Sequence, residues 1–549
     1  MTPVEHFNDL VNRFYDDYFR FNPILGREMG FNRYAGRVPD LSYEIIMGFL
    51  KRLQFYNVEI NRLMDEDLSK QQKVDLVQLE MTVNYERFAI QRLRWWERDP
   101  MQYTFMLDIS GYIKRNYAPL ETRLQHTINH LKGIPELLIQ QRYNLKLVQP
   151  KVNLETAIEM YHGYVDYFSN EVTEAFLESN DSKLIIELKH TLSETVAAIE
   201  EFLQYTEEIL LPAANNEFSI GRFNFLDLLR FGEMVDIDLS KLIEIGEGDL
   251  EKNKKLFEET AEKLMPGEQP QEVMSEIAKD HPSPENLINE TSNMLEDIRQ
   301  FLIDKDILTV PSEERIKVDE TPSFLRYGFA MCDVPGPFEK TASESFYYVT
   351  NVRPDWSEKE KEEWLTKFDY ATLDNVSVHE AYPGHYVHYL HTKSAPSKVA
   401  KIFGAYSFWE GWAHYAEEMM LKEGWHENDL KFKLAQLSEA LLRNSRFICA
   451  IKMHALNMSV EEATKFIMEN AYMAETPAKK EAERGTFDPA YLNYTLGKLM
   501  ILKLKDDWEK QEGDSYSLKR FHDTFLSFGA PPIPLVRKLM LKEDSEVLF

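Results

Sequence analysis

The sequence predicts a mainly α-helical protein with a small amount of β-structure near residues 325–352. Apolar residues recur at spacings of three and four along most of the chain, as in Leu184–Leu210 and Leu430–Lys452, where Ala, Leu, Glu and Lys dominate. Alternating apolar and polar runs are rare, and Phe346–Asn351 is the best candidate for a strand. Helices therefore supply most of the predicted core.

Length and composition predict a large folded core with an N-terminal part and a C-terminal part. The 549 residues are 44% hydrophobic. We expect one helical region over residues 1–310 and a second over 311–549, packed as one continuous unit. Residues 244–292 are dense in charge and are predicted to connect helical regions. Residues 310–357 combine Pro and Gly with aromatic side chains, which predicts ordered loops.

The chain is acidic, with a formal net charge of −29. Such a chain repels phosphate backbones, so nucleic-acid binding is disfavoured. Its two cysteines, Cys332 and Cys449, form no C-x-x-C pair, which excludes a disulfide scaffold and a thiolate zinc site. We expect no signal peptide and no membrane partner, because no basic segment precedes an apolar stretch and no apolar run is long enough to span. A cytoplasmic location follows as an expectation, and the oligomeric state is left open.

Residues 379–385 carry the pattern that is most informative about function, His-Glu-Ala-Tyr-Pro-Gly-His. This is the zinc-binding pattern HExxH with two residues inserted before the second histidine. On a regular helix, His379 and His385 would point roughly 120° apart. A Pro-Gly pair lies at the insertion, so we expect the helix to bulge or break at 382–384 and to turn His385 back toward His379.

A catalytic zinc site needs a third protein ligand and one open position. The segment Phe408–Glu417 is predicted to be helical, with Glu410 and Glu417 on one face and about 10 Å apart along the axis. They cannot both bind one ion. Glu410 is therefore predicted as the ligand, and Glu417 as an outer carboxylate that accepts a hydrogen bond from a ligand imidazole. His414, one turn after Glu410, is a competing candidate.

Glu380, next to His379, is the predicted general base, which takes a proton from water at the metal and passes it to the leaving amine. His388 and His391 lie nearby, and ordinary positions on the following helix explain them better than metal binding does. Core packing likewise explains the aromatic residues of the two motifs, which are Tyr382, Tyr386, Tyr389, Trp409 and Trp412.

At these residues the chain resembles the bacterial domain-of-unknown-function family 885. That family carries an HExxPGH motif followed by an EGWAxYxE helix, and here the two segments read HEAYPGH at 379–385 and EGWAHYAE at 410–417. The likeness covers most of the chain, from residues 22–23 through 489–494 to 529–532. Matches this widely spread and in order indicate a real relationship.

The resemblance implies a gluzincin-like metallopeptidase related to thimet oligopeptidase-like and carboxypeptidase Taq-like enzymes. It implies one zinc ion per chain, short peptides as substrates, and a helical fold with a deep channel between two lobes. In those enzymes a glutamate some two dozen residues after the second histidine is the third ligand, and Glu410 occupies that position. Dipeptidyl peptidase III provides a precedent for an insertion within the motif.

Four further residues are candidates for handling the substrate. Tyr494 and His454 are predicted to stabilise the oxyanion, because a phenol or imidazole donor opposite the zinc suits carbonyl hydrolysis. Packing between helices is the alternative for Tyr494. Arg484 or Arg446 is predicted to bind the terminal carboxylate of a peptide, with a structural ion pair as the alternative.

Several positions depart from the family pattern. The family motif RxxxDxGxH corresponds to residues 446–454, where Ala450 stands in place of the acid and Lys452 in place of the glycine. The family segment PGQ corresponds to Pro-Ala-Tyr, which ends in Tyr491. His388 stands where the family has Gln. We expect the metal site to be intact and the substrate preference or rate to be altered.

Three functions are compatible with these patterns. The first is a zinc-dependent hydrolase that cleaves peptide bonds of short peptides. The second is a zinc hydrolase of a non-peptide amide or ester, which only a substrate screen would separate from the first. The third is a non-catalytic helical binding protein whose site has decayed. The sequence contains no nucleophile-elbow, P-loop or dinucleotide-binding motif that would favour another enzyme class.

Overall fold

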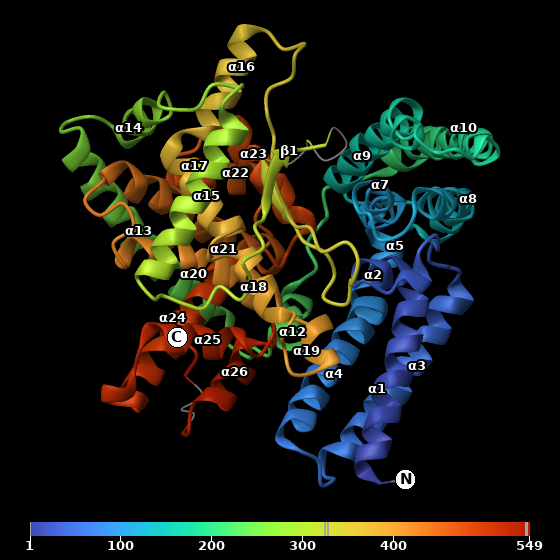
Figure 1. The fold of residues 1–549 in the computed structure, drawn as a ribbon, viewed down its shortest axis with the longest axis horizontal. Helices are drawn as coiled ribbons and strands as arrows, with labels where there is room; N and C mark the ends of the chain where they lie inside the picture. The colour runs from blue at the N-terminus through green and yellow to red at the C-terminus, as the bar shows by residue number, and fades with distance from the viewer. Residues whose placement is uncertain (1, 323–325, 327–328, 544–546) are drawn as a thin grey trace. The chain divides into compact units, whose positions relative to one another are not determined.

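A computed structural model describes residues 2–322, 326, 329–543 and 547–549, and its described part is mainly helical with one small sheet (Figure 1). The predicted fold class is confirmed. The chain divides into two compact units, Met1–Phe218 with Pro335–Glu344, and Ser219–Val334 with Ser345–Phe549. The division at residue 310 and the channel between two lobes stay predictions.

The first unit consists of helices joined by short loops. Helix α1 begins after Thr2, whose hydroxyl accepts from the amide of Glu5 while the Glu5 carboxylate accepts from the amide of Thr2. The α-helices of this unit are α1 (Pro3–Phe21), α2 (Pro23–Glu28), α3 (Tyr43–Met64), α4 (Lys70–Phe88), α5 (Trp95–Arg98), α6 (Pro100–Thr104), α7 (Ser110–Lys114), α8 (Leu120–Asn144), α9 (Lys151–Asn170), α10 (Ser182–Tyr205) and α11 (Leu211–Ala213). The helix predicted at Leu184–Leu210 is confirmed as α10, followed by a π-helical turn over Thr206–Leu210.

The second unit holds both sequence motifs. Its α-helices are α12 (Arg222–Glu233), α13 (Leu239–Leu264), α14 (Pro270–Ile277), α15 (Leu287–Asp304), α16 (Glu358–Leu365), α17 (Tyr370–Glu380), α18 (His385–Thr392), α19 (Lys398–Ile402), α20 (Tyr406–Lys422), α21 (Leu430–Ala455), α22 (Val460–Ala471), α23 (Glu475–Phe487), α24 (Asn493–Glu512), α25 (Leu518–Leu526) and α26 (Ile533–Met540). The helix predicted at Leu430–Lys452 is confirmed as α21.

The sheet has three strands in the order β1-β3-β2, with β1 parallel and β2 antiparallel to the central β3. Its strands are β1 (Lys317–Glu320), β2 (Ala330–Asp333) and β3 (Phe346–Val349). The strand predicted at Phe346–Asn351 is confirmed as β3, and the remaining described residues of 310–357 are mostly loops. Residues 323–325 and 327–328 of the predicted region lie outside the described residues. Strand β1 lies just before the region in which sheet was predicted. The sequence did not predict this strand, because KVDE has no apolar alternation.

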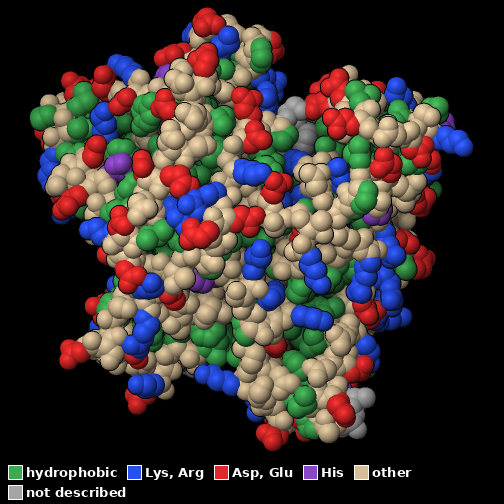
Figure 2. Space-filling view, viewed as in Figure 1, with side chains coloured by type: hydrophobic (Ala, Val, Ile, Leu, Met, Phe, Trp, Pro, Cys, Tyr) green, Lys and Arg blue, Asp and Glu red, His purple; other side chains and the backbone are tan. Residues whose placement is uncertain are grey.

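The expectation that residues 244–292 only connect helices is wrong. They lie largely within α13, α14 and the start of α15. In α13 the residues Leu242, Leu250 and Phe257 are buried at helical spacing, while most charged side chains face solvent. The charge density therefore marks the solvated faces of amphipathic helices. On the face drawn in Figure 2, acidic and basic side chains are interspersed over the surface.

Close packing between α20 and α24 positions the second motif. Gly411 of α20 faces Gly497 of α24, and a Cβ atom added to Gly411 would lie 2.5 Å from the Cα atom of Gly497. Side chains larger than hydrogen would push these helices apart. Helix α21 is buried along most of its length and packs on α13, where Asn444 donates to Asp249 over 2.8 Å. Among the described residues, no helix combines the length and apolarity needed to span a bilayer.

Candidate metal centre

The two motif histidines lie on separate helices that meet at a break. Helix α17 ends at Glu380 and α18 begins at His385, so the break predicted at 382–384 is confirmed. Gly384 lies so close to the preceding turn that an added Cβ atom would be 1.7 Å from the carbonyl oxygen of His379. This close approach brings the two imidazole rings to a centroid separation of 4.8 Å, with their planes at 88°.

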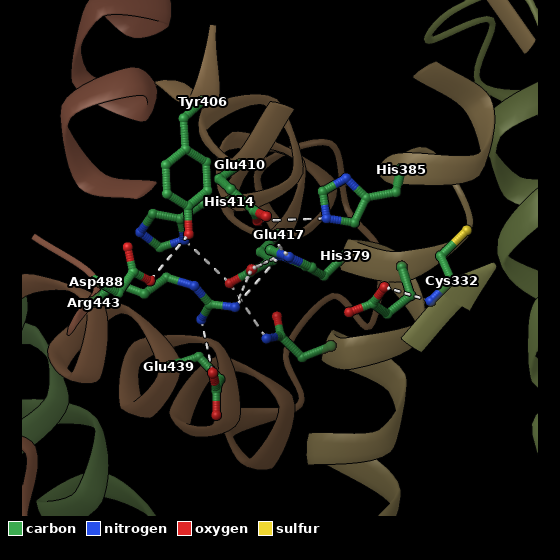
Figure 3. A network of polar contacts seen from close by, with 12 residues as sticks. Cys332, His379, His385, Tyr406, Glu410, His414, Glu417, Glu439, Arg443 and Asp488 are labelled. Carbon is green, nitrogen blue, oxygen red and sulfur yellow. Dashed lines mark hydrogen bonds and ion pairs between the residues drawn. The ribbon is translucent and has the colours of Figure 1, made fainter. Parts of the chain in front are cut away.

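Glu410 completes a set of three potential ligand atoms (Figure 3). Its Oε2 atom lies 3.4 Å from Nε2 of His379 and 3.4 Å from Nε2 of His385. Ligand atoms bound tetrahedrally to zinc at about 2.1 Å are about 3.4 Å apart, so the spacing suits this ion. This oxygen is buried and accepts no hydrogen bond of normal geometry from the described residues. The donor set therefore fits a metal ion in composition and in spacing.

Glu380 lies beside this set. One ligand atom from each of His379, Glu380 and His385 lies within 4.8 Å of the others, and this group could hold a metal ion. The backbone amide of Cys332 in β2 donates to Oε2 of Glu380 over 3.0 Å. This contact orients the carboxylate from the sheet side, and Glu380 keeps partial exposure to solvent.

A buried carboxylate lies behind His379. Glu417 is 1% exposed, and its Oε1 atom is 2.7 Å from Nδ1 of His379 and 3.1 Å from Nη2 of Arg443. Asn375 also donates to Glu417, over 3.4 Å. Engagement of Nδ1 leaves Nε2 of His379 directed at Glu410. This is the geometry predicted for an outer carboxylate.

The charges of this cluster shift the acidities of its members. Burial alone would lower the pKa of His379, but its contacts with Glu410 and Glu417 raise that pKa to about 9. Burial opposes ionisation of Glu410, yet the two imidazoles hold its pKa well below its usual range. Arg443 and His414 likewise hold the pKa of Glu417 low against the effect of burial. Both carboxylates are therefore ionised at neutral pH.

Tyr494 lies next to this cluster, on α24. Its ring stacks on that of His379 with a centroid separation of 6.3 Å. Three guanidinium groups surround the phenol ring, with Cζ atoms 5.4–6.0 Å from its centroid; they belong to Arg443, Arg446 and Arg484. The structure thus brings both predicted substrate-binding arginines toward the metal group.

His454 is not brought to this group. It follows Arg443 by eleven residues on α21, about 16 Å along the helix axis. Its Nε2 atom contacts the carbonyl oxygen of Gly485 at 2.7 Å, and its Nδ1 atom accepts from the amide of Ile220 at 3.4 Å. Its role as an oxyanion donor has no support in the geometry, because both ring nitrogens contact backbone groups.

The other histidines near the motifs also have partners. His388 and His391 contact the carbonyl oxygens of Gly529 and Thr309 at 2.9 and 2.8 Å. His414 is buried with Nδ1 3.3 Å from Glu417, so it lies behind the ligand set. Sequence reasoning missed Arg443, because it lies in a mixed stretch, Leu442-Arg443-Asn444-Ser445, in which no local pattern marks it.

The fold and site define a helical protein with an HExxH-like group of side chains that could hold a metal ion. Residues 23–540 match the family model described as "Bacterial protein of unknown function (DUF885)", and the chain belongs to that family. The curated proteins contain no match.

Two solved structures share the fold. One is described as a "putative lipoprotein of unknown function" from Shewanella oneidensis, with 22% identity and a TM-score of 0.82 over 98% of this chain and 100% of the other. The other is a "putative lipoprotein" from Colwellia psychrerythraea, with 18% identity and a TM-score of 0.82 over 98% of each chain.

Proposed function

We propose that this protein is a zinc-dependent hydrolase that cleaves peptide bonds of short peptides. The observation that carries the proposal is the spacing of 3.4 Å from the buried Oε2 of Glu410 to the Nε2 atoms of His379 and His385. Two imidazoles and one carboxylate are the ligand set of catalytic zinc in peptidases. When bound, zinc would polarise the scissile carbonyl and lower the pKa of a water molecule.

Glu380 is the proposed general base. It lies beside the ligand set, and the amide of Cys332 holds one of its carboxylate oxygens at 3.0 Å. The other oxygen is then directed to take a proton from the attacking water and deliver it to the leaving amine. Because Glu380 is partly exposed, water can reach it.

Tyr494 is the proposed donor to the developing oxyanion. Burial and the nearby Glu410 carboxylate raise the pKa of its phenol, so the hydroxyl keeps its proton at neutral pH. A protonated hydroxyl beside the ligand set would stabilise negative charge on the carbonyl oxygen. Its stacking on His379 fixes the ring against the ligand set.

Two of the departures from the family pattern, Ala450 and Lys452, lie away from this group. Ala450 is buried on α21, seven residues or about 10 Å beyond Arg443. Lys452 pairs with Glu247 of α13 at 3.3 Å. Both substitutions thus fall in the packing between α21 and its neighbours, which favours an active enzyme over a decayed site.

Metal content and turnover test the proposal together. Protein purified with zinc is expected to hold about one ion per chain and to cut short peptides. Glu380→Gln is expected to keep the zinc and lower turnover by about 10²- to 10⁴-fold, because Gln still accepts from the Cys332 amide but takes no proton. Glu423→Gln, on an exposed residue after α20, is the matched control.

Other outcomes would contradict the proposal. Full activity of Glu380→Gln would reject the mechanism. Hydrolysis of acylated amines or esters without cleavage of any peptide would assign the zinc site to non-peptide substrates. Failure to bind zinc would support the alternative of a non-catalytic binding protein.

The cellular location is a separate proposal. We propose a cytoplasmic location. Peptides and no nucleic acid are the expected partners, because a chain with a net charge of −29 repels phosphate backbones. The word lipoprotein in the descriptions of the two solved proteins makes the cell envelope the alternative. Fractionation of cells followed by immunodetection would decide between the two compartments.

A further inference from the structure

The three arginines around Tyr494 differ in exposure. The side chain of Arg443 is 7% exposed and that of Arg446 is 10% exposed, whereas that of Arg484 is 32% exposed. Only Arg484 therefore combines proximity to Tyr494 with substantial access from solvent.

The three arginines also differ in how they are paired. Arg446 forms a two-by-two fork with Glu481, in which Nε and Nη2 each bind their own carboxylate oxygen at 2.7 and 2.8 Å. Arg484 instead directs both Nε and Nη2 at a single oxygen of Asp488, at 3.2 and 2.9 Å. The fork is the geometry that arginine prefers with carboxylates. Arg446 is thus satisfied within the protein, and Arg484 lacks a partner of that geometry among the described residues.

Arg484 lies over the face of α20 that carries the metal ligand. Its Nη2 atom is 3.4 Å from the hydroxyl of Tyr406, and Tyr406 is one helical turn before Glu410. The Tyr406 hydroxyl is also 3.5 Å from Asp488, the outer limit of a hydrogen bond. Figure 3 shows Tyr406 reaching past Glu410 toward Asp488. The hydroxyl and the guanidinium could therefore turn to a shared anionic partner.

The geometry points to Arg484, with Tyr406, as the recognition site for the free terminal carboxylate of the peptide substrate. This inference rests on the proposed function and makes the enzyme one that shortens peptides from the carboxyl end. Arg484 provides a charged fork on the exposed side of the cluster, and a substrate carboxylate supplies the two oxygens that Asp488 does not offer.

Distances limit the length of the fragment that is released. The ring centre of Tyr494 is 6.3 Å from that of His379 and 6.0 Å from Cζ of Arg484, so the guanidinium lies within about 12 Å of the ligand imidazole. An extended chain spans about 3.4 Å per residue. A carboxylate held by Arg484 would thus leave roughly one to three residues between itself and the scissile bond.

Paired substrates test this assignment. One library of random hexapeptides is prepared as free acids and as carboxamides, and products of the zinc-loaded enzyme are identified by mass spectrometry. We expect kcat/KM for the free acids to exceed that for the carboxamides by about 10- to 100-fold, with cuts within the last three residues. Equal cleavage of both forms, or cuts spread evenly along the peptides, would overturn the inference.

Variants separate recognition from a structural role. Arg484→Gln is expected to lower kcat/KM on free acids about 10- to 100-fold and to change that on carboxamides less than about twofold. Arg484→Lys, which keeps the charge without the fork, is expected to recover part of the loss. Lys479→Gln is the matched control, because Lys479 is an exposed cation of the same helix, 3.8 Å from Glu483. An equal loss on both substrate forms would mean that Arg484 supports Tyr494 or the fold and does not recognise the carboxylate.

Binding without turnover distinguishes failure of this inference from failure of the proposed function. Zinc-loaded Glu380→Gln protein is titrated calorimetrically with hexa-alanine as the free acid and as the carboxamide. Preference for the acid that disappears with Arg484→Gln supports carboxylate recognition even if the wild-type protein cuts no peptide. Equal binding of the two forms rejects it even if peptides are cut.

Discussion

Nδ1 of His379 lies 2.7 Å from Oε1 of Glu417, although the two residues are 38 positions apart in the chain. The contact determines which ring nitrogen of His379 faces Glu410. Arg443 binds the same carboxylate oxygen at 3.1 Å and helps to keep it ionised. The orientation of a predicted metal ligand thus depends on charges from two other helices, α20 and α21.

Loss of the Glu417 carboxylate should weaken metal binding. Glu417→Gln is expected to raise the zinc dissociation constant about 10- to 100-fold, because an amide orients the imidazole without raising its basicity. Competition with a chromogenic chelator measures the affinity, and circular dichroism checks the fold. Glu439→Gln is the control, since Glu439 binds Arg443 at 2.7 Å on its other side. Equal zinc affinity of wild type and Glu417→Gln would contradict this account of the buried carboxylate.

Zinc affinity should fall as the pH falls. In the metal-free protein the contacts with Glu410 and Glu417 outweigh the effect of burial and raise the pKa of His379 to about 9. Below that pH the ring carries a proton that a metal must displace, so the dissociation constant is expected to rise about tenfold per pH unit between 8 and 6. Above pH 9 the dependence should flatten. Chelator competition across this range measures it, and a constant affinity from pH 6 to 8 would refute the prediction.

Removal of one hydroxyl should separate catalysis from metal binding. Tyr494→Phe is expected to lower kcat about 10²- to 10³-fold with unchanged zinc content, because the oxyanion loses its donor. Tyr491→Phe is a close control, since it removes a buried hydroxyl that has no hydrogen-bond partner in the described structure. Steady-state kinetics and metal analysis of both variants would reject the assignment if the two lost activity equally.

A buried carboxyl group outside the metal site should reduce stability at high pH. Burial raises the pKa of Glu233 to about 7 despite hydrogen bonds from the amide and hydroxyl of Ser407. An unfolded glutamate titrates near pH 4.3, so the folded form binds the proton more tightly. Its contribution is complete below that pH and is lost as the pH rises through about 7.

Glu233→Gln should remove this dependence. Between pH 5 and pH 8 the free energy of unfolding of wild type is expected to fall by about 3 kcal/mol relative to that of the variant, because glutamine does not ionise. Urea denaturation at several pH values measures the difference, with Glu423→Gln as the exposed control. Parallel stability curves for wild type and Glu233→Gln would show that the carboxyl group does not titrate in this range.

The sequence by itself determined the local features of this protein. Helical periodicity, the break before His385 and the strand at Phe346 depend on neighbours within a few residues, and the structure has all three. The charge density of residues 244–292 led to a wrong prediction, because composition alone does not show which face of a helix is buried.

The tertiary structure alone decided which distant groups meet. The sequence offered Glu410 and His414 as competing partners, and the fold placed Glu410 between the two imidazoles and His414 behind Glu417. It also brought Arg443 to the cluster and engaged His454 with backbone groups. Such contacts depend on how closely and at what angle helices cross, and those quantities arise from packing over the whole core, which no local pattern contains.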